Sequence, residues 1–179
     1  MLSKENSLVI VIDIQEKLVS ALEKDTVVSN ASKIIAAANH MEIPVLVTEQ
    51  YPKGLGETVS DLKSVMPQNT EYVEKTYFNA LLEDGFLEKI KSFGKKQIVI
   101  MGIETHICVY QTASALIDEG FEVFVVKDAC ASRKKYEFKQ GIEAMKDNGV
   151  KISCIEMVIF EWLKGAKNPK FKEIQALIK

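Results

Sequence analysis

Short apolar runs rich in β-branched residues alternate along this sequence with longer segments of helical periodicity. Several of the runs are apolar at successive positions rather than at every second one, as in LVIVI and QIVIMG. This pattern is typical of strands that are buried on both faces of a parallel sheet. The predicted strands are Leu8–Ile12, Pro44–Thr48, Tyr72–Glu74, Gln97–Gly102, Glu122–Val126 and Val150–Ser153.

The segments between these runs have the spacing of amphipathic helices. Gly94, Gly120 and Gly149 stand where a helix has to end before the next strand begins. The β-α-β-α order therefore predicts a doubly wound α/β sheet with right-handed crossovers. The predicted helices are Thr26–Met41, Ala80–Phe93, Ile107–Glu119, Tyr136–Asn148 and a terminal helix within Asn168–Ile178 that has Pro169 in its first turn.

Length and composition favour a single globular domain over residues 1–179. Hydrophobic residues make up 47% of the 179 residues, which is enough for a substantial core. The net charge of −2 does not favour nucleic acid or an anionic membrane surface as a partner. No apolar run approaches the roughly 20 residues of a membrane span. Three cysteines, an odd number, form no disulfide framework, which favours a reducing cytoplasm. None pairs as C-x-x-C, which argues against a zinc site.

One connection is long for an α/β loop. Between Thr48 and Glu71 the chain reads EQYPKGLGETVSDLKSVMPQNT. Long ordered loops often cover binding sites, whereas others are surface excursions. Both interpretations stay open here, the second with one short helix in the loop.

Three residues that can act together in catalysis follow three different predicted strands. In open α/β sheets, ligands bind beyond the carboxyl ends of the strands. Asp13 follows the first strand, Lys75 the third, and Cys108 stands a few residues after the fourth. A carboxylate can take a thiol proton, and an ammonium group can offset the repulsion between carboxylate and thiolate. The grouping predicts a nucleophilic site at this edge of the sheet.

Each of these residues also has a structural interpretation. Asp13 could be the N-cap of a helix over Ile14–Leu22, and Lys75 taken alone resembles a surface lysine. If Thr105 is an N-cap, Cys108 is the third helical residue, where unpaired N–H groups and the helix dipole favour a thiolate. Otherwise Cys108 is a buried structural cysteine. We expect Cys130 and Cys154 to be structural.

Other catalytic patterns are absent from the sequence. It contains no G-x-S-x-G elbow, no P-loop and no G-x-G-x-x-G after the first strand. A Cys–His pair would need one of the two histidines. His40 stands near a predicted helix end, and His106, two residues before Cys108 on a helix, points elsewhere.

Three segments resemble motifs of the isochorismatase-like cysteine hydrolases. VIDIQEKL is similar to their V-x-D-x-Q start, and EKTYFNA to their K-x-x-F segment. GIETHICVYQTA, the most specific of the three, resembles their G-x-x-T-x-x-C-V-x-x-T-A signature. The resemblance extends over nearly the whole chain. The segments TEQYPKGLGET, VKDACASR and NPKFKEIQALIK look closest to the isochorismatase domain-containing branch.

The resemblance implies a fold and a set of site residues. The implied fold is a three-layer one, a six-stranded parallel sheet of order 3-2-1-4-5-6 with helices on both faces. The implied catalytic triad is Asp13, Lys75 and Cys108. A non-proline cis peptide is implied between Ile103 and Glu104, which would aim the N–H groups of Glu104 and Cys108 into an oxyanion hole. We expect the substrate pocket to be lined by Gln50, Tyr51, Phe78 and Ile103.

The resemblance also implies an activity. Because Cys108 is retained, it implies hydrolysis of a small amide-type (C–N) or related substrate through a covalent cysteine intermediate. Nicotinamidases of the superfamily bind a metal through an Asp and histidines after the second strand, but EQYPKGLGET contains no histidine. The chain is therefore expected to need no metal or other cofactor. Members of the family usually associate, so a homo-oligomer is expected.

Two other functional interpretations remain open. One is a non-catalytic domain that binds a small molecule or senses redox state through a reactive Cys108 thiol. The other is an oligomeric scaffold with a decayed site, against which the intact Asp13, Lys75 and Cys108 argue.

Overall fold

The computed structural model describes residues 1–22 and 26–178, and its strands form one parallel sheet. The order is β3-β2-β1-β4-β5-β6, so the expected fold class and strand order are confirmed. The central strands β1 and β4 are buried at every residue, whereas the edge strands β3 and β6 are partly exposed. The strands are β1 (Ser7–Ile12), β2 (Val45–Gln50), β3 (Glu71–Lys75), β4 (Gln97–Ile103), β5 (Glu122–Ala131) and β6 (Lys151–Ser153).

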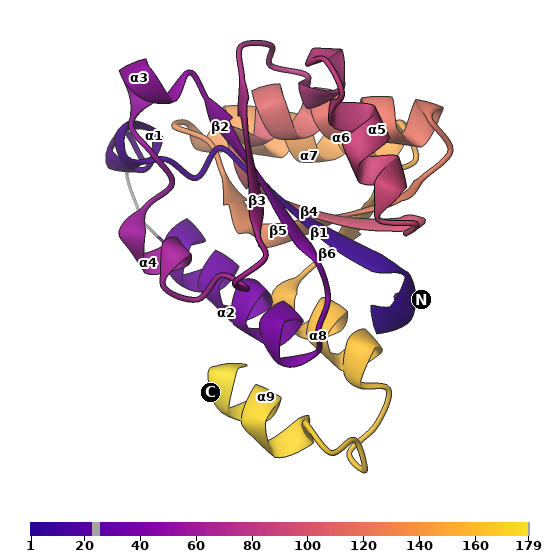
Figure 1. Cartoon of the computed structure of the whole chain (residues 1–179). Helices are drawn as coiled ribbons and strands as arrows, with labels where there is room; N and C mark the ends of the chain where they lie inside the picture. Colours follow the sequence, from indigo (N-terminus) through magenta and orange to yellow (C-terminus); the bar gives the residue numbers. More distant parts are fainter. Residues whose placement is uncertain (23–25, 179) are drawn as a thin grey trace.

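Helices cover both faces of the sheet and make the fold three layers thick (Figure 1). One layer contains α2 (Val27–His40), α8 (Ile155–Leu163) and α9 (Phe171–Ile178), with α9 on the outside. The other contains α5 (Phe86–Ser92), α6 (Tyr110–Asp118) and α7 (Lys135–Asp147). The shorter elements are η1 (Lys4–Asn6), α1 (Glu16–Ser20), α3 (Pro52–Leu55), α4 (Ser60–Lys63), η2 (Ala80–Leu82) and the π-helical turn η3 (Thr105–Val109).

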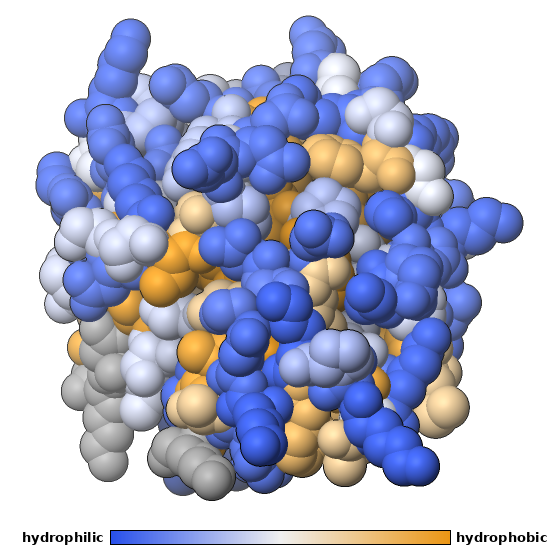
Figure 2. Space-filling view, turned by 60° about the horizontal axis from the view of Figure 1, so that its bottom comes forward, coloured by the Kyte–Doolittle hydropathy of each residue, from blue (hydrophilic) through white to orange (hydrophobic). Residues whose placement is uncertain are grey.

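The outward side of the α2, α8 and α9 layer is mostly hydrophilic. Figure 2 shows small apolar areas there, separated by polar and charged side chains. Beneath this surface, the indole N–H of Trp162 in α8 donates to the Ser7 hydroxyl of β1 at 2.9 Å. No helix among the described residues is long and apolar enough to cross a membrane.

Two helix predictions were wrong in detail, and one helix was not predicted. The helix expected over Ala80–Phe93 is two elements, η2 and α5. Gly85, which directly precedes α5, has a φ of 77° and interrupts the helical conformation. Helix α8 was not predicted, since its sequence IEMVIFEWL lacks the polar stripe that marks an amphipathic helix. The terminal helix α9 begins at Phe171, so Pro169 lies in the turn before it.

Strand β5 continues past the predicted end at Val126. A register shift lies between Ile100, opposite Val125, and Gly102, opposite Cys130. The bulge accommodates polar residues that would otherwise end a strand. Within it, Asp128 accepts the Ile155 N–H at 3.0 Å at the start of α8. The residues after β5 lie at the carboxyl edge of the sheet, as they do after every strand of a parallel sheet.

The long connection after β2 is fixed to the carboxyl edge and contains two short helices, α3 and α4, rather than one. The side-chain amide of Gln15 donates to the carbonyls of Gln50, at 3.0 Å, and Gly56, at 2.6 Å. Glu49 accepts both the N–H and the hydroxyl of Thr58 at 2.7 Å. These hydrogen bonds hold the connection close to Asp13, the residue that follows β1.

Candidate active site

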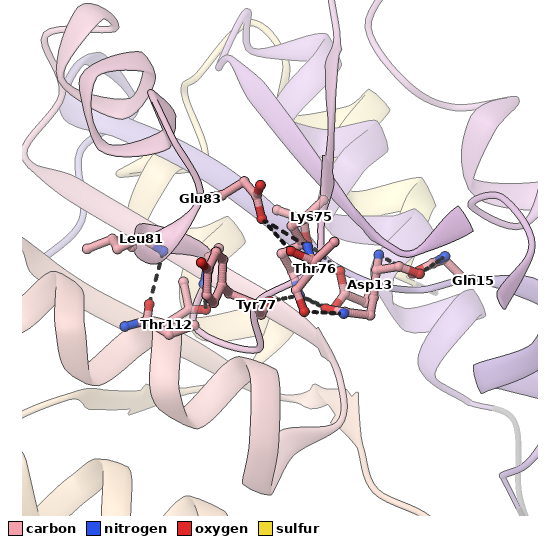
Figure 3. Close-up of polar contacts among 12 residues, drawn as sticks. Asp13, Gln15, Lys75, Thr76, Tyr77, Leu81, Glu83 and Thr112 are labelled. Carbon is pink, nitrogen blue, oxygen red and sulfur yellow. Dashed lines mark hydrogen bonds and ion pairs between the residues drawn. The ribbon is translucent and has the colours of Figure 1, made fainter. Parts of the chain in front are cut away.

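A buried ion pair joins the ends of β1 and β3. Asp13 directly follows β1 and Lys75 is the last residue of β3, and Figure 3 shows their side chains pointing toward one another. Lys75 Nζ lies 2.7 Å from Asp13 Oδ2, and neither side chain is accessible to solvent. Asp13 Oδ1 accepts the Thr48 hydroxyl at 2.6 Å. The helix-cap interpretation of Asp13 was wrong, because α1 begins at Glu16 with Gln15 as its N-cap.

The Lys75 ammonium has two hydrogen-bond acceptors in addition to its ion pair with Asp13. Besides Asp13, it donates to the side-chain oxygen of Gln50 at 2.6 Å and to the backbone carbonyl of Tyr77 at 3.1 Å. A buried charge is tolerated only when it is paired and hydrogen-bonded. The surface interpretation of Lys75 was therefore wrong.

Cys108 lies in the π-helical turn that follows β4. The N-cap is Glu104, so the condition that Thr105 is the N-cap is not met. The Glu104 carbonyl accepts the N–H groups of Ile107 at 3.1 Å and Val109 at 3.3 Å. Helix α7 packs closely on this turn at Gly141, where an added Cβ would lie 2.8 Å from the Cα of His106. The turn is thus held between β4 and α7, with Cys108 only 6% exposed.

The surroundings of Cys108 keep its thiol protonated at rest. Burial raises the pKa of Cys108 to about 12, and the negative charge of Asp13 and a side-chain interaction with it act in the same direction. Lys75 opposes them and lowers the pKa of this thiol. The expectation that the helix start would favour a thiolate was wrong for the resting site. Asp13 and Lys75 thus both act on the pKa of Cys108, in opposite directions.

The backbone between β4 and Cys108 presents a free donor. The Ile103–Glu104 peptide bond is cis, the geometry that the family resemblance implies. Among the described residues, the Glu104 N–H donates to no acceptor. The Glu104 side chain is buried and accepts from Arg133 Nε, so the residue is fixed at both its backbone and its carboxylate.

The four expected pocket residues lie in different surroundings. Gln50 is half-buried and contacts Lys75. Tyr51 is exposed and borders a hollow of about 280 Å³ that Lys75 also lines. Phe78 is more than half exposed, while Ile103 lies within the hydrophobic core. Contact of these residues with a substrate stays a prediction.

One further cluster beside the site has metal-ligand chemistry. Glu104, His106 and Glu137 offer ligand atoms within 4.8 Å of one another, the one such group among the described residues. Its members already have protein partners, since Glu104 binds Arg133 and His106 Nδ1 lies 3.0 Å from the Ser132 hydroxyl. His106 makes these contacts rather than one with Cys108, in line with the expectation from its position in the helix.

Comparison with known proteins identifies the family of the chain. A family model described as the isochorismatase domain matches residues 7–157. The isochorismatase domain-containing protein 2 of Xenopus laevis is 37% identical over 179 residues, which cover 99% of this chain and 85% of the relative.

Two solved structures have nearly the same backbone. The MAR1 ribonuclease of Caenorhabditis elegans superposes with a TM-score of 0.93 at 35% identity and covers 99% of this chain and 91% of its own. The YcaC gene product of Escherichia coli, described as an octameric hydrolase of unknown specificity, gives a TM-score of 0.92 at 27% identity, with 99% and 88% covered.

Proposed function

The chain belongs to the isochorismatase-like hydrolase family, and we propose on this premise that it is a cysteine-dependent hydrolase of small amide-type (C–N) or related substrates. The observation that carries the proposal is the buried 2.7 Å ion pair of Asp13 and Lys75, which acts on the pKa of Cys108. Covalent catalysis can use a nucleophile that is activated by an adjacent base, and a fixed cation offsets the negative charge that this arrangement brings together.

In the proposed first half-reaction, the Asp13 carboxylate takes the thiol proton as the sulfur of Cys108 attacks the substrate carbonyl carbon. The carbonyl oxygen becomes an oxyanion and accepts the N–H groups of Glu104 and Cys108. The C–N bond then breaks, the proton passes from Asp13 to the leaving nitrogen, and a thioester remains on Cys108. Lys75 stays an ammonium throughout and limits the repulsion between carboxylate and sulfur.

In the second half-reaction, Asp13 takes a proton from water, and the resulting hydroxide attacks the thioester carbon. The carbon–sulfur bond breaks, the acid product leaves, and the proton on Asp13 returns to the Cys108 sulfur. The raised pKa of Cys108 suits this cycle, because the thiol keeps its proton until a substrate is present.

The direct test is a screen of amides and carbamates with the wild type and Cys108→Ala. We expect turnover of at least one member by the wild type and none by the variant. Modification of Cys108 by peroxide without turnover of any member would instead favour a redox-sensing domain. A short RNA belongs in the panel because of the name of the nematode relative. We expect no RNA cleavage, since the chain has a net charge of −2.

The raised pKa of Cys108 predicts a distinctive response to alkylation. Iodoacetamide should label this thiol slowly at neutral pH, with a rate that rises about tenfold for each pH unit through the alkaline range. Asp13→Asn should label faster than the wild type, because it removes a charge that raises the thiol pKa. Mass spectrometry of the Cys108 peptide gives the rate. A plateau below pH 9 would contradict the prediction.

We propose that the reaction needs no metal. The polar groups around Asp13 and Lys75 are occupied by protein partners, and the connection after β2 contains no histidine. Treatment with EDTA should therefore leave turnover unchanged, and elemental analysis should show less than one zinc or iron per chain. Activity that EDTA removes and a metal salt restores would overturn this part of the proposal.

We also propose that the chain self-associates, as the octameric description of the Escherichia coli relative suggests. Light scattering on the purified protein measures the mass in solution against the 20.1 kDa chain. A mass of one chain at micromolar concentration would contradict the proposal.

A further inference from the structure

A chain of side-chain hydrogen bonds leads from the first strand to the Lys75 ammonium. Gln15, fully buried two residues after Asp13, accepts the Gln50 N–H at 2.7 Å and donates to the Gln50 carbonyl at 3.0 Å. The side-chain amide of Gln15 thus binds both the N–H and the carbonyl of the Gln50 backbone. The Gln50 side chain then accepts Lys75 Nζ at 2.6 Å.

The orientation of the Gln50 side-chain amide is fixed by the hydrogen bond of its nitrogen. Its Nε2 donates to the carbonyl of Thr76 at 2.8 Å, so its oxygen is the atom turned toward Lys75. Lys75 Nζ consequently lies among three oxygens, of which only that of Asp13 carries a charge. A neutral acceptor at this position satisfies the ammonium without competing electrostatically with Asp13.

We propose that Gln50 is a positioning residue that orients the Lys75 ammonium toward Asp13 and Cys108, and that Gln15 acts through Gln50. The inference rests on the proposed role of Lys75. It assigns Gln50, expected from the sequence as a pocket wall, to the catalytic cation instead. It also gives the glutamine of the V-x-D-x-Q segment a function, since this glutamine joins the ends of β1 and β2.

The test uses the alkylation rate of Cys108, which requires no substrate. Gln50→Glu places a second carboxylate on Lys75 and draws the ammonium away from Asp13 and the thiol. We expect labelling of Cys108 to slow about tenfold at a given pH, which corresponds to one pKa unit. Gln50→Met keeps the side-chain length but removes the acceptor, and should slow labelling severalfold. Gln15→Met should act in the same direction.

Gln68→Glu is the matched control, because Gln68 is exposed, lies before β3 rather than at the carboxyl edge, and undergoes the same change of charge. It should label Cys108 at the wild-type rate. The half-buried Cys154 serves as an internal reference, since a general loosening of the fold would change its labelling too. Once a substrate is known, the Gln50 variants should lower kcat with little change in KM.

The outcomes separate the two proposals. If both Gln50 variants label Cys108 within twofold of the wild type while Asp13→Asn and Lys75→Met change its rate, the positioning role is overturned and the proposed triad stands. If none of these variants changes the rate, the coupling of Cys108 to Asp13 and Lys75 fails, and the positioning role fails with it. Equal slowing in the Gln68→Glu control would also overturn the positioning role.

Discussion

Asp13→Asn is expected to lower turnover on a good substrate by about 10²–10⁴-fold, the usual contribution of a general acid–base residue. Asparagine can still accept the Thr48 hydroxyl, so the loss reports the missing proton acceptor rather than a missing contact. The same variant should alkylate faster at Cys108, because a negative charge beside the thiol is gone. Slower turnover together with faster alkylation would indicate that Asp13 acts as a base and does not only have a structural role.

Lys75→Met should lower turnover by a similar factor for a different reason. Without the ammonium, proton transfer leaves a carboxyl group and a thiolate with no compensating cation in a buried site. Alkylation of Cys108 should slow as well, because Lys75 lowers the pKa of this thiol. Near-wild-type turnover in either single variant would make the role of that residue structural.

The stability of these variants gives an independent measurement. Each single substitution leaves one buried charge unpaired, which costs about 3–5 kcal/mol in the free energy of unfolding. The double variant Asp13→Asn/Lys75→Met removes both charges and should regain most of that loss. Urea unfolding of the four proteins tests this coupling. Turnover should stay at the level of the single variants, since restored stability does not restore a base.

The sequence was informative about the site wherever a polar residue ended an apolar run. Asp13 and Lys75 could be predicted because the carboxyl ends of parallel strands meet at one edge, which is a property of the topology. The pairing itself could not be read from the sequence, since β3 and β1 are separated by β2. The contact between Gln50 and Lys75 could not be read from the sequence either, because the two residues are 25 positions apart in the chain.

The contacts of Glu104 show a second limit of the sequence. Lys127 and Asp128 indicate the end of a strand, but β5 bulges and continues for several residues. Arg133, two residues after the end of β5, donates to the carboxylate of Glu104. The length of β5 depends on register between strands, and the ion pair joins residues 29 positions apart, so no local pattern could have predicted either.

Gly102→Ala is expected to destabilise the protein by more than about 4 kcal/mol, a size that only a few mechanisms produce. Gly102 has a φ of 146°, which L side chains rarely adopt, and an added Cβ would lie 2.1 Å from the carbonyl oxygen of Ile12. That oxygen belongs to the buried backbone of β1, which has no flexible end that could move aside. Alanine would therefore force the two central strands apart.

The separation of β1 and β4 would occur next to the candidate active site. Ile12 and Gly102 are paired residues of β1 and β4, and they directly precede Asp13 and the Ile103–Glu104 peptide bond. Any variant protein that still folds should therefore have Asp13 displaced from the Glu104 N–H, and should lose turnover beyond what its stability explains. Circular dichroism before the assay measures the folded fraction, and assays at equal concentrations of folded protein separate the loss of stability from the loss of turnover.

Gly120→Ala provides the matched control for this prediction. Gly120 also has a positive φ, 85°, but an added Cβ would meet nothing within 4 Å. Its substitution should cost only the strain of a left-handed alanine, about 1–2 kcal/mol. Urea unfolding of both variants isolates the contribution of the contact with Ile12. Equal destabilisation by the two substitutions would show that β1 and β4 can separate freely at this point, and the close approach would then not be what fixes Asp13 beside the nucleophile turn.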